Sequence, residues 1–197
     1  MSAVEVIFDN DRWIRVPLDY ADTPWRDAEE WADWLAESAT SGRPDAETVA
    51  PLVRSGARAV ALFPAAHVWA RFWHYPIASI PTGFADVYVQ SREPDGTDAE
   101  DLLPDPGFTA LDPVVEVFSI DGFISAARRH SLPLVLRSED DAEPAVLPRL
   151  EWLGVTPEWV CYLVTNDHDP AAIADREADV EALFRSMAEP RGRETDR

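Results

Sequence analysis

Lysine is absent from this sequence, and all 17 of its basic residues are arginines. They are outnumbered by 37 aspartates and glutamates, which gives a formal net charge of −20. Tight binding of nucleic acid or anionic membrane needs clustered basic residues, so the balance argues against both partners. It favours a basic protein partner, because opposite charges speed encounter. Part of the acidity is also typical of a GC-rich or salt-adapted genome.

Cysteine and long apolar runs are also scarce. Cys161 is the only cysteine, which excludes an intramolecular disulfide and fits a reducing compartment. No run of about 18 apolar residues occurs, so no membrane-spanning segment is predicted. The first five residues have neither the basic start nor the apolar core of a signal peptide, so we expect a cytoplasmic protein.

The motifs of common enzymes and cofactor sites are missing. The eight glycines are scattered and form neither a P-loop nor G-x-G-x-x-G, and no H-E-x-x-H or G-x-S-x-G occurs. His67 and His74 are seven residues apart, so they would face opposite sides of a strand or share one side of a helix, and neither arrangement favours a metal site. His168 lies between Asp167 and Asp169, but adjacent side chains rarely converge on one ion. We therefore predict no catalytic residue, no cofactor and no metal.

Cys161 and His130 are the one pair that could be drawn as nucleophile and base. A catalytic thiol needs exposure and a lowered pKa. Cys161 lies in the apolar run W-V-C-Y-L, which favours a buried structural thiol instead.

The stretch 114–129, V-V-E-V-F-S-I-D-G-F-I-S-A-A-R-R, predicts a hairpin around Asp121-Gly122. Both faces of these strands are apolar near the turn, which predicts a sheet covered on both sides. A two-residue turn would place Ile120 opposite Phe123, Phe118 opposite Ser125 and Glu116 opposite Ala127.

The other elements follow from periodicity and capping signals. Thr23 and Pro24 predict the start of a tryptophan-rich helix that ends before Gly42. A second helix is expected over 46–55, ending at Gly56, and a closing helix over 170–187 with Asp169 as N-cap. Strands are expected over 4–8, 13–16, 57–63, 67–75, 86–92, 145–153 and 158–166, the last of them central and beside the hairpin.

This order of elements predicts an α+β protein whose antiparallel β-sheet is covered by helices on both faces, a three-layer α/β/α sandwich. Residues 1–189 are expected to form a single globular domain. Residues 190–197, P-R-G-R-E-T-D-R, are expected to be a disordered C-terminal tail.

Several segments, taken in order, carry a resemblance. They are W-I-R-V-P-L, P-W-R-D-A-E-E-W-A, A-V-A-L-F-P, V-E-V-F-S-I-D-G-F-I-S-A-A-R-R, W-V-C-Y-L-V and the final helix. The chain resembles small actinobacterial proteins with a PsbP-like fold, which is shared by an extrinsic photosystem subunit and a nuclear-import factor that binds a small GTPase. The resemblance implies a non-catalytic module that binds a protein or a small ligand, since known members are mostly adaptors and assembly factors.

Three functional hypotheses remain open. The first is a cytosolic interaction module, such as an adaptor, an assembly factor or a chaperone-like protein. The second is an immunity-type inhibitor of a basic toxin, and the third is an enzyme or small-ligand binder with a tryptophan-lined pocket. The side chains predicted to form an interaction surface are Trp31, Trp34, Trp69, Trp73, Arg128, Arg129 and His130.

Overall fold

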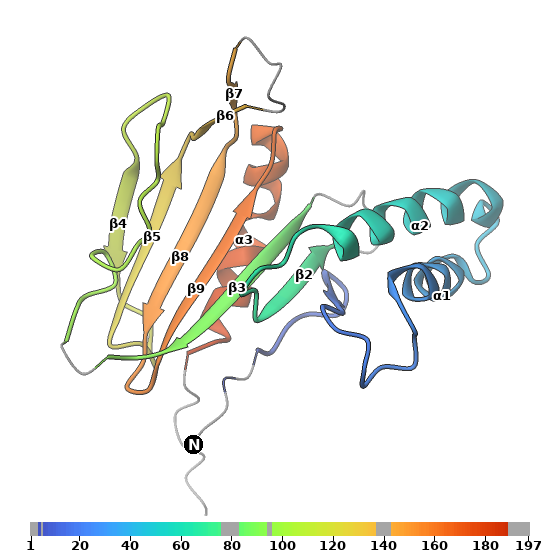
Figure 1. Ribbon diagram of the computed structural model, residues 1–197, viewed down its shortest axis with the longest axis horizontal. Helices are drawn as coiled ribbons and strands as arrows, with labels where there is room; N and C mark the ends of the chain where they lie inside the picture. The colour runs from blue at the N-terminus through green and yellow to red at the C-terminus, as the bar shows by residue number, and fades with distance from the viewer. Residues whose placement is uncertain (1–3, 5, 76–82, 94–95, 137–142, 189–197) are drawn as a thin grey trace, which may run out of the picture.

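The computed structural model describes residues 4, 6–75, 83–93, 96–136 and 143–188. Most of its strands form one antiparallel seven-stranded sheet in the order β1-β2-β3-β9-β8-β5-β4 (Figure 1). These strands are β1 (Trp13–Val16), β2 (Ala70–His74), β3 (Phe84–Ser91), β4 (Val114–Phe118), β5 (Ser125–Ser131), β8 (Arg149–Val155) and β9 (Trp159–Asn166). Two short strands, β6 (Leu134–Val135) and β7 (Ala145–Val146), pair separately.

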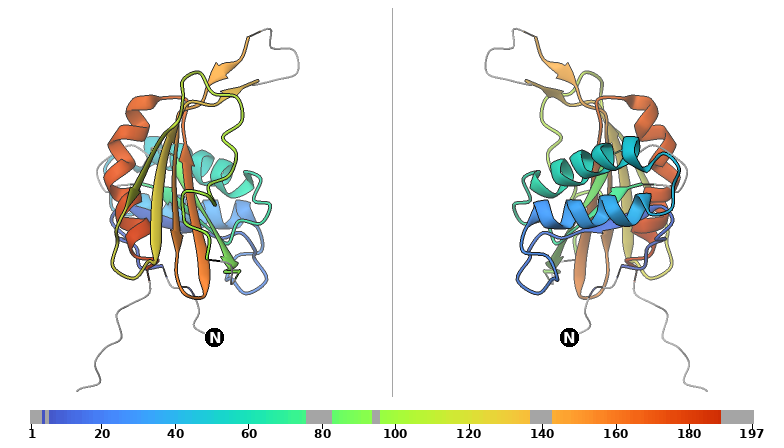
Figure 2. Two further views of the ribbon diagram at one scale, coloured as in Figure 1. Left: turned by 90° about the vertical axis from the view of Figure 1, so that its left-hand side faces the viewer. Right: turned by 90° about the vertical axis from the view of Figure 1, so that its right-hand side faces the viewer.

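The helices do not sandwich the sheet, so the predicted three-layer α/β/α arrangement is wrong. Only α3 (Pro170–Arg185) lies along a face, against β8 and β9. The helices α1 (Ala28–Thr40) and α2 (Ala46–Leu62) pair with each other and project from the β1–β2 end of the sheet (Figures 1 and 2).

The pairing of α1 with α2 has a simple cause. Their apolar stripes, which include Trp31, Leu35, Val53 and Ala57, pack mainly on each other, and they meet the sheet only around Val16, Trp73 and Phe84. On the same face of the sheet, the opposite half is covered by a loop instead. Ala99 of that loop is fully buried against Ala127 and Leu153.

The main core lies between α3 and the sheet. Along β8 and β9, side chains such as Trp152 and Leu163 alternate toward α3, where they meet Val180 and Phe184. The prediction of β9 as a central strand is confirmed, although its neighbours are β3 and β8 rather than the hairpin strands. Asp169 caps α3 as predicted, since its carboxylate accepts a hydrogen bond from the Ala171 N–H.

The hairpin forms with the predicted two-residue turn, since the Phe123 N–H donates to the Ile120 carbonyl at 3.1 Å. Its strands are shifted by one residue from the predicted register: Glu116 faces Arg128 and Phe118 faces Ala126. The strands stop before the turn because Ile120 and Phe123 enter the core under α3. The Phe123 ring stacks on Phe184 with 4.9 Å between centroids. Burial of Ile120 and Phe123 is worth more than the backbone hydrogen bonds that a longer hairpin would add.

Three local predictions are also corrected. The strand predicted over 4–8 does not form where the structure describes these residues, and β1 pairs with β2 alone among the described strands. The N-cap of α1 is Asp27 rather than Thr23. The strand predicted from residue 57 is instead the end of α2, which runs past Pro51 and Gly56 without a break. Arg71 donates hydrogen bonds to the carbonyls of Val60 and Phe63 at the C-terminus of that helix. The positive charge of Arg71 is stabilising at a helix C-terminus, and no sequence signal indicated that Arg71 would lie at the end of α2.

Candidate functional site

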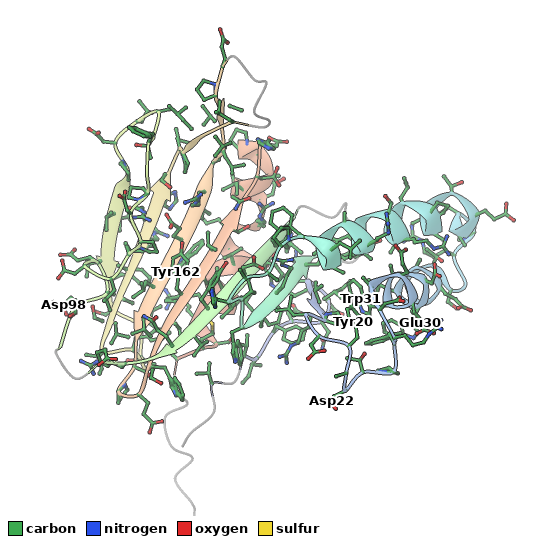
Figure 3. All side chains as sticks on the ribbon, viewed as in Figure 1. Tyr20, Asp22, Glu30, Trp31, Asp98 and Tyr162 are labelled. Carbon is green, nitrogen blue, oxygen red and sulfur yellow. The ribbon has the colours of Figure 1, made fainter. Side chains whose placement is uncertain are left out.

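The four tryptophans predicted to form a surface divide into two groups. Trp31 and Trp73 are buried, so their assignment to an interaction surface is wrong; Figure 3 shows Trp31 beside the helical pair. Trp34 and Trp69 remain 47% and 39% exposed. Each rests on a neighbour, because Trp34 packs on Trp25 at 4.8 Å and Trp69 lies under the Arg15 guanidinium at 5.9 Å.

Arg128 and His130 point toward α3 and meet carboxylates of the same chain. Arg128 lies 2.7 Å from Glu116 and 3.6 Å from Glu177, and His130 Nε2 lies 3.4 Å from Glu177. These two side chains therefore pair with carboxylates of their own molecule. Such partly exposed pairs contribute only about 0–1 kcal/mol each.

Arg129 points to the opposite face and is buried, so it belongs to no surface. Its guanidinium forms two hydrogen bonds with Glu151, at 2.7 and 2.8 Å. The Tyr162 hydroxyl donates a third bond to Glu151 at 2.6 Å. Burial, and then the charge of Glu151, raises the pKa of Tyr162, so this tyrosine stays a neutral phenol. The three side chains form a fixed polar network across β5, β8 and β9.

Cys161 and His130 do not form a nucleophile and base. The register places His130 opposite Leu150 and Cys161 opposite Gly154, roughly 13 Å apart along β8 by the ordinary rise of a strand. Burial raises the pKa of the Cys161 thiol to about 12, which is the behaviour of a structural cysteine. Within the described residues, no group of three or more His, Cys, Asp or Glu side chains could hold a metal ion.

The surface that stands out is β4, which forms one edge of the sheet. Its three valines, Val114, Val115 and Val117, are 57%, 45% and 60% exposed, on both faces of the strand. Phe118 at the end of β4 packs near Phe184 of α3, at 6.5 Å between centroids, but the three valines stay exposed. The prediction that this hairpin is covered on both sides is therefore wrong for most of β4. Figure 2 shows this edge facing the viewer in its left-hand view. We call β4 and its exposed valines the open edge.

The backbone of the open edge is also unpaired on its outer side. In an antiparallel ladder, alternate residues of an edge strand direct their N–H and C=O groups away from the sheet. Among the described residues, β4 pairs with β5 alone. The chain segment that leads into β4 is held in place, because the Ala110 N–H donates a hydrogen bond to the Leu132 carbonyl at 2.8 Å.

The stretch of sequence that contains the open edge has charges of one sign. Between Arg92 and Arg128 the sequence has no basic residue. The acidic residues described in that interval are Glu93, Asp98, Glu100, Asp101, Asp105, Asp112, Glu116 and Asp121. Charged side chains and prolines are the usual protection of an edge strand, yet β4 has a single charge, Glu116, which Arg128 already pairs.

A side pocket of about 360 Å³ adjoins the start of β4. Leu111, Val114, Leu150 and Ile173 give it apolar walls. Its charged and titratable lining is mixed, because Asp112 and Glu177 stand beside His130 and Arg149. Its apolar walls can cover an apolar side chain that reaches past the start of β4.

Sequence patterns missed the open edge because V-V-E-V-F is apolar on both faces, which indicates a strand buried on both faces just as well. The one sequence feature that distinguishes this strand is the absence of basic residues between Arg92 and Arg128.

No family model and no curated protein matches this chain. None of the described helices is both long enough and apolar enough to cross a membrane.

Proposed function

We propose that this protein is a cytoplasmic, non-catalytic interaction module that binds an extended, basic segment of another protein by pairing it with the open edge. The observation that carries the proposal is an edge strand with unpaired backbone and exposed valines on both faces. A monomeric protein rarely leaves such a strand bare, because it templates pairing with another chain.

Strand addition matches the geometry of the open edge. An added strand would satisfy the outward N–H and C=O groups of β4 and would lay alternate side chains over each face. Val115 and Val117 are available on one face, and Val114 on the other. Apolar side chains of the partner would cover these valines.

The partner's charge follows from the acidic interval. A segment with arginines or lysines among its apolar residues would meet the exposed carboxylates of that interval, such as Asp112, and could place one apolar side chain in the side pocket. A second copy of this chain fits poorly, because each copy has a net charge of −20 and offers no free base at this edge.

The proposal is tested by comparing what three forms of the protein retain from host lysate. The forms are wild type, a Val115→Lys and Val117→Lys double variant, and a Leu52→Lys control. Leu52 is an exposed apolar residue on α2, far from β4. Lysines on an edge strand block pairing.

We expect a basic protein that binds wild type and the Leu52→Lys control and is lost from the β4 variant. Its identity would then separate an adaptor from an inhibitor of a basic toxin. A partner retained equally by all three forms would overturn the assignment to the open edge. If the protein instead dimerised through β4, the proposal of a basic partner at the open edge would also be overturned.

A further inference from the structure

The sheet face that carries the Arg129–Glu151–Tyr162 network also holds a groove that the proposed function does not use. It has a volume of about 640 Å³. Tyr88, Tyr162, Leu153 and Val160 form its floor, and His67 and Leu102 stand at its sides. We call this the central groove. Its size is that of sites for metabolite-sized ligands.

Two tyrosine rings lie side by side in the floor. Tyr88 and Tyr162 are directly paired across β3 and β9, and their ring centroids are 5.7 Å apart. Figure 3 shows Tyr162 over the middle of the sheet. Its ring is fixed from behind, because its hydroxyl is bonded to Glu151 and Glu151 is held by Arg129. The aromatic floor is therefore prepared before any ligand arrives.

Free polar groups converge on the same space. The Tyr88 hydroxyl and the Gln90 amide form no hydrogen bond with another side chain in the part of the chain that the structure describes. His67 is presented by a turn in which the Val68 N–H bonds the Ala65 carbonyl, and its φ of 61° is one that residues other than glycine rarely adopt. A few polar groups around an apolar floor are the usual composition of a ligand site.

The charges decide which ligand fits. No arginine, aspartate or glutamate lines the central groove, but the loop that bounds it exposes Glu100, Asp101 and Asp105. An anion would be repelled by this loop and by the charge of −20. A cation would be attracted by both and by the faces of the tyrosine rings.

We propose that the central groove binds a planar aromatic cation of metabolite size. The flat body would lie on Tyr88 and Tyr162, and the positive charge would face the acidic loop. This site is separate from the open edge, so either proposal can fail without the other.

The probe we would use is thioflavin T, a planar benzothiazolium cation whose fluorescence rises when its internal rotation is restricted. Its uncharged analogue, 2-(4-dimethylaminophenyl)-6-methylbenzothiazole, has the same shape without the charge. We expect saturable binding of thioflavin T at one site and binding of the analogue that is weaker by about tenfold, within the range of cation–π and local charge effects. Equal affinity for the two dyes would overturn the cationic assignment.

Variants locate the bound dye. Gln90→Trp places a ring into the groove from an exposed position and should abolish binding, whereas Leu52→Trp adds the same ring elsewhere and should leave binding unchanged. Tyr88→Ala should weaken binding by about tenfold and Tyr88→Phe should preserve it, since stacking needs the ring and not the hydroxyl. Circular dichroism checks that each variant is folded.

Unchanged dye binding by Gln90→Trp and Tyr88→Ala would refute the site, as would wild type that binds no thioflavin T. The Val115→Lys and Val117→Lys double variant should bind the dye normally. Loss of dye binding in that variant would move the site to the open edge.

Discussion

The seven-stranded sheet ends in β1 on one side and in β4 on the other, and the two edges differ in what covers them. At β1, Trp13 and Val16 are buried, and α1 and α2 pack over Val16 and its neighbour Trp73. At β4 the valines face solvent on both sides. The side chains of one terminal strand are thus covered by a helical pair and those of the other face solvent, which indicates that β1 contributes more to the packed core than β4 does.

The largest expected effect comes from truncating one tryptophan at the closed edge. Trp73→Ala removes a buried ring that joins β2 to α2, and we expect a loss of about 3–5 kcal/mol in the free energy of unfolding. The matched change at the open edge, Val115→Ala, should cost no more than about 0.5 kcal/mol. Urea unfolding of both variants measures the difference. Similar losses would show that β4 is as much a part of the stable core as β2.

A middle-sized effect is expected where the open hairpin is anchored. Gly154 lies beneath the Phe123 ring, and a Cβ at this position would come within 2.5 Å of Phe123 Cε1. Gly154→Ala should therefore destabilise the protein by about 1–3 kcal/mol, the usual cost of overpacking. Adding Phe123→Leu to Gly154→Ala should recover part of that loss if the clash is the cause. No recovery would point to a different role for Gly154.

The smallest effect is a pH dependence near the closed edge. His74 is buried beside Asp179, with 2.8 Å between Nε2 and Oδ2, and burial lowers its pKa below the ordinary value of 6.5. The unfolded chain then takes up the proton first, so the contribution of neutral His74 is present above about pH 6.5 and is lost as the pH falls toward the folded pKa. The free energy of unfolding should fall between pH 7.5 and 5.5 more steeply in wild type than in His74→Gln. Parallel slopes would contradict this assignment.

The sequence predicted many elements because their signals are local. The run W-V-C-Y-L-V-T-N gave β9, and Asp169 with Pro170 gave the start of α3. The layers were not predictable in the same way. Two amphipathic helices can cover a sheet or each other, and the apolar stripe that includes Trp31 and Leu35 is the same in both cases.

The candidate sites were predicted less well because they depend on contacts between distant segments. Nothing near Arg129 in the sequence indicates that it would be buried against Glu151. Trp31 and Trp34 are both aromatic residues of one helix, and only the packing of α2 separates the buried ring from the exposed one. The open edge escaped notice because an apolar strand is typical of a core until its neighbours are known.

Hydrogen–deuterium exchange of the β4 amides tests the central claim most directly. In the free protein, the outward N–H groups of β4 should exchange quickly, while the amides of β8 and β9 exchange slowly. Added in excess, a synthetic peptide that alternates valine with arginine should protect those β4 amides and leave β1 unchanged, whereas a peptide with glutamate in place of arginine should not. Protection of β4 already complete in the free monomer, or β4 exchange that the basic peptide leaves unaltered, would contradict the account.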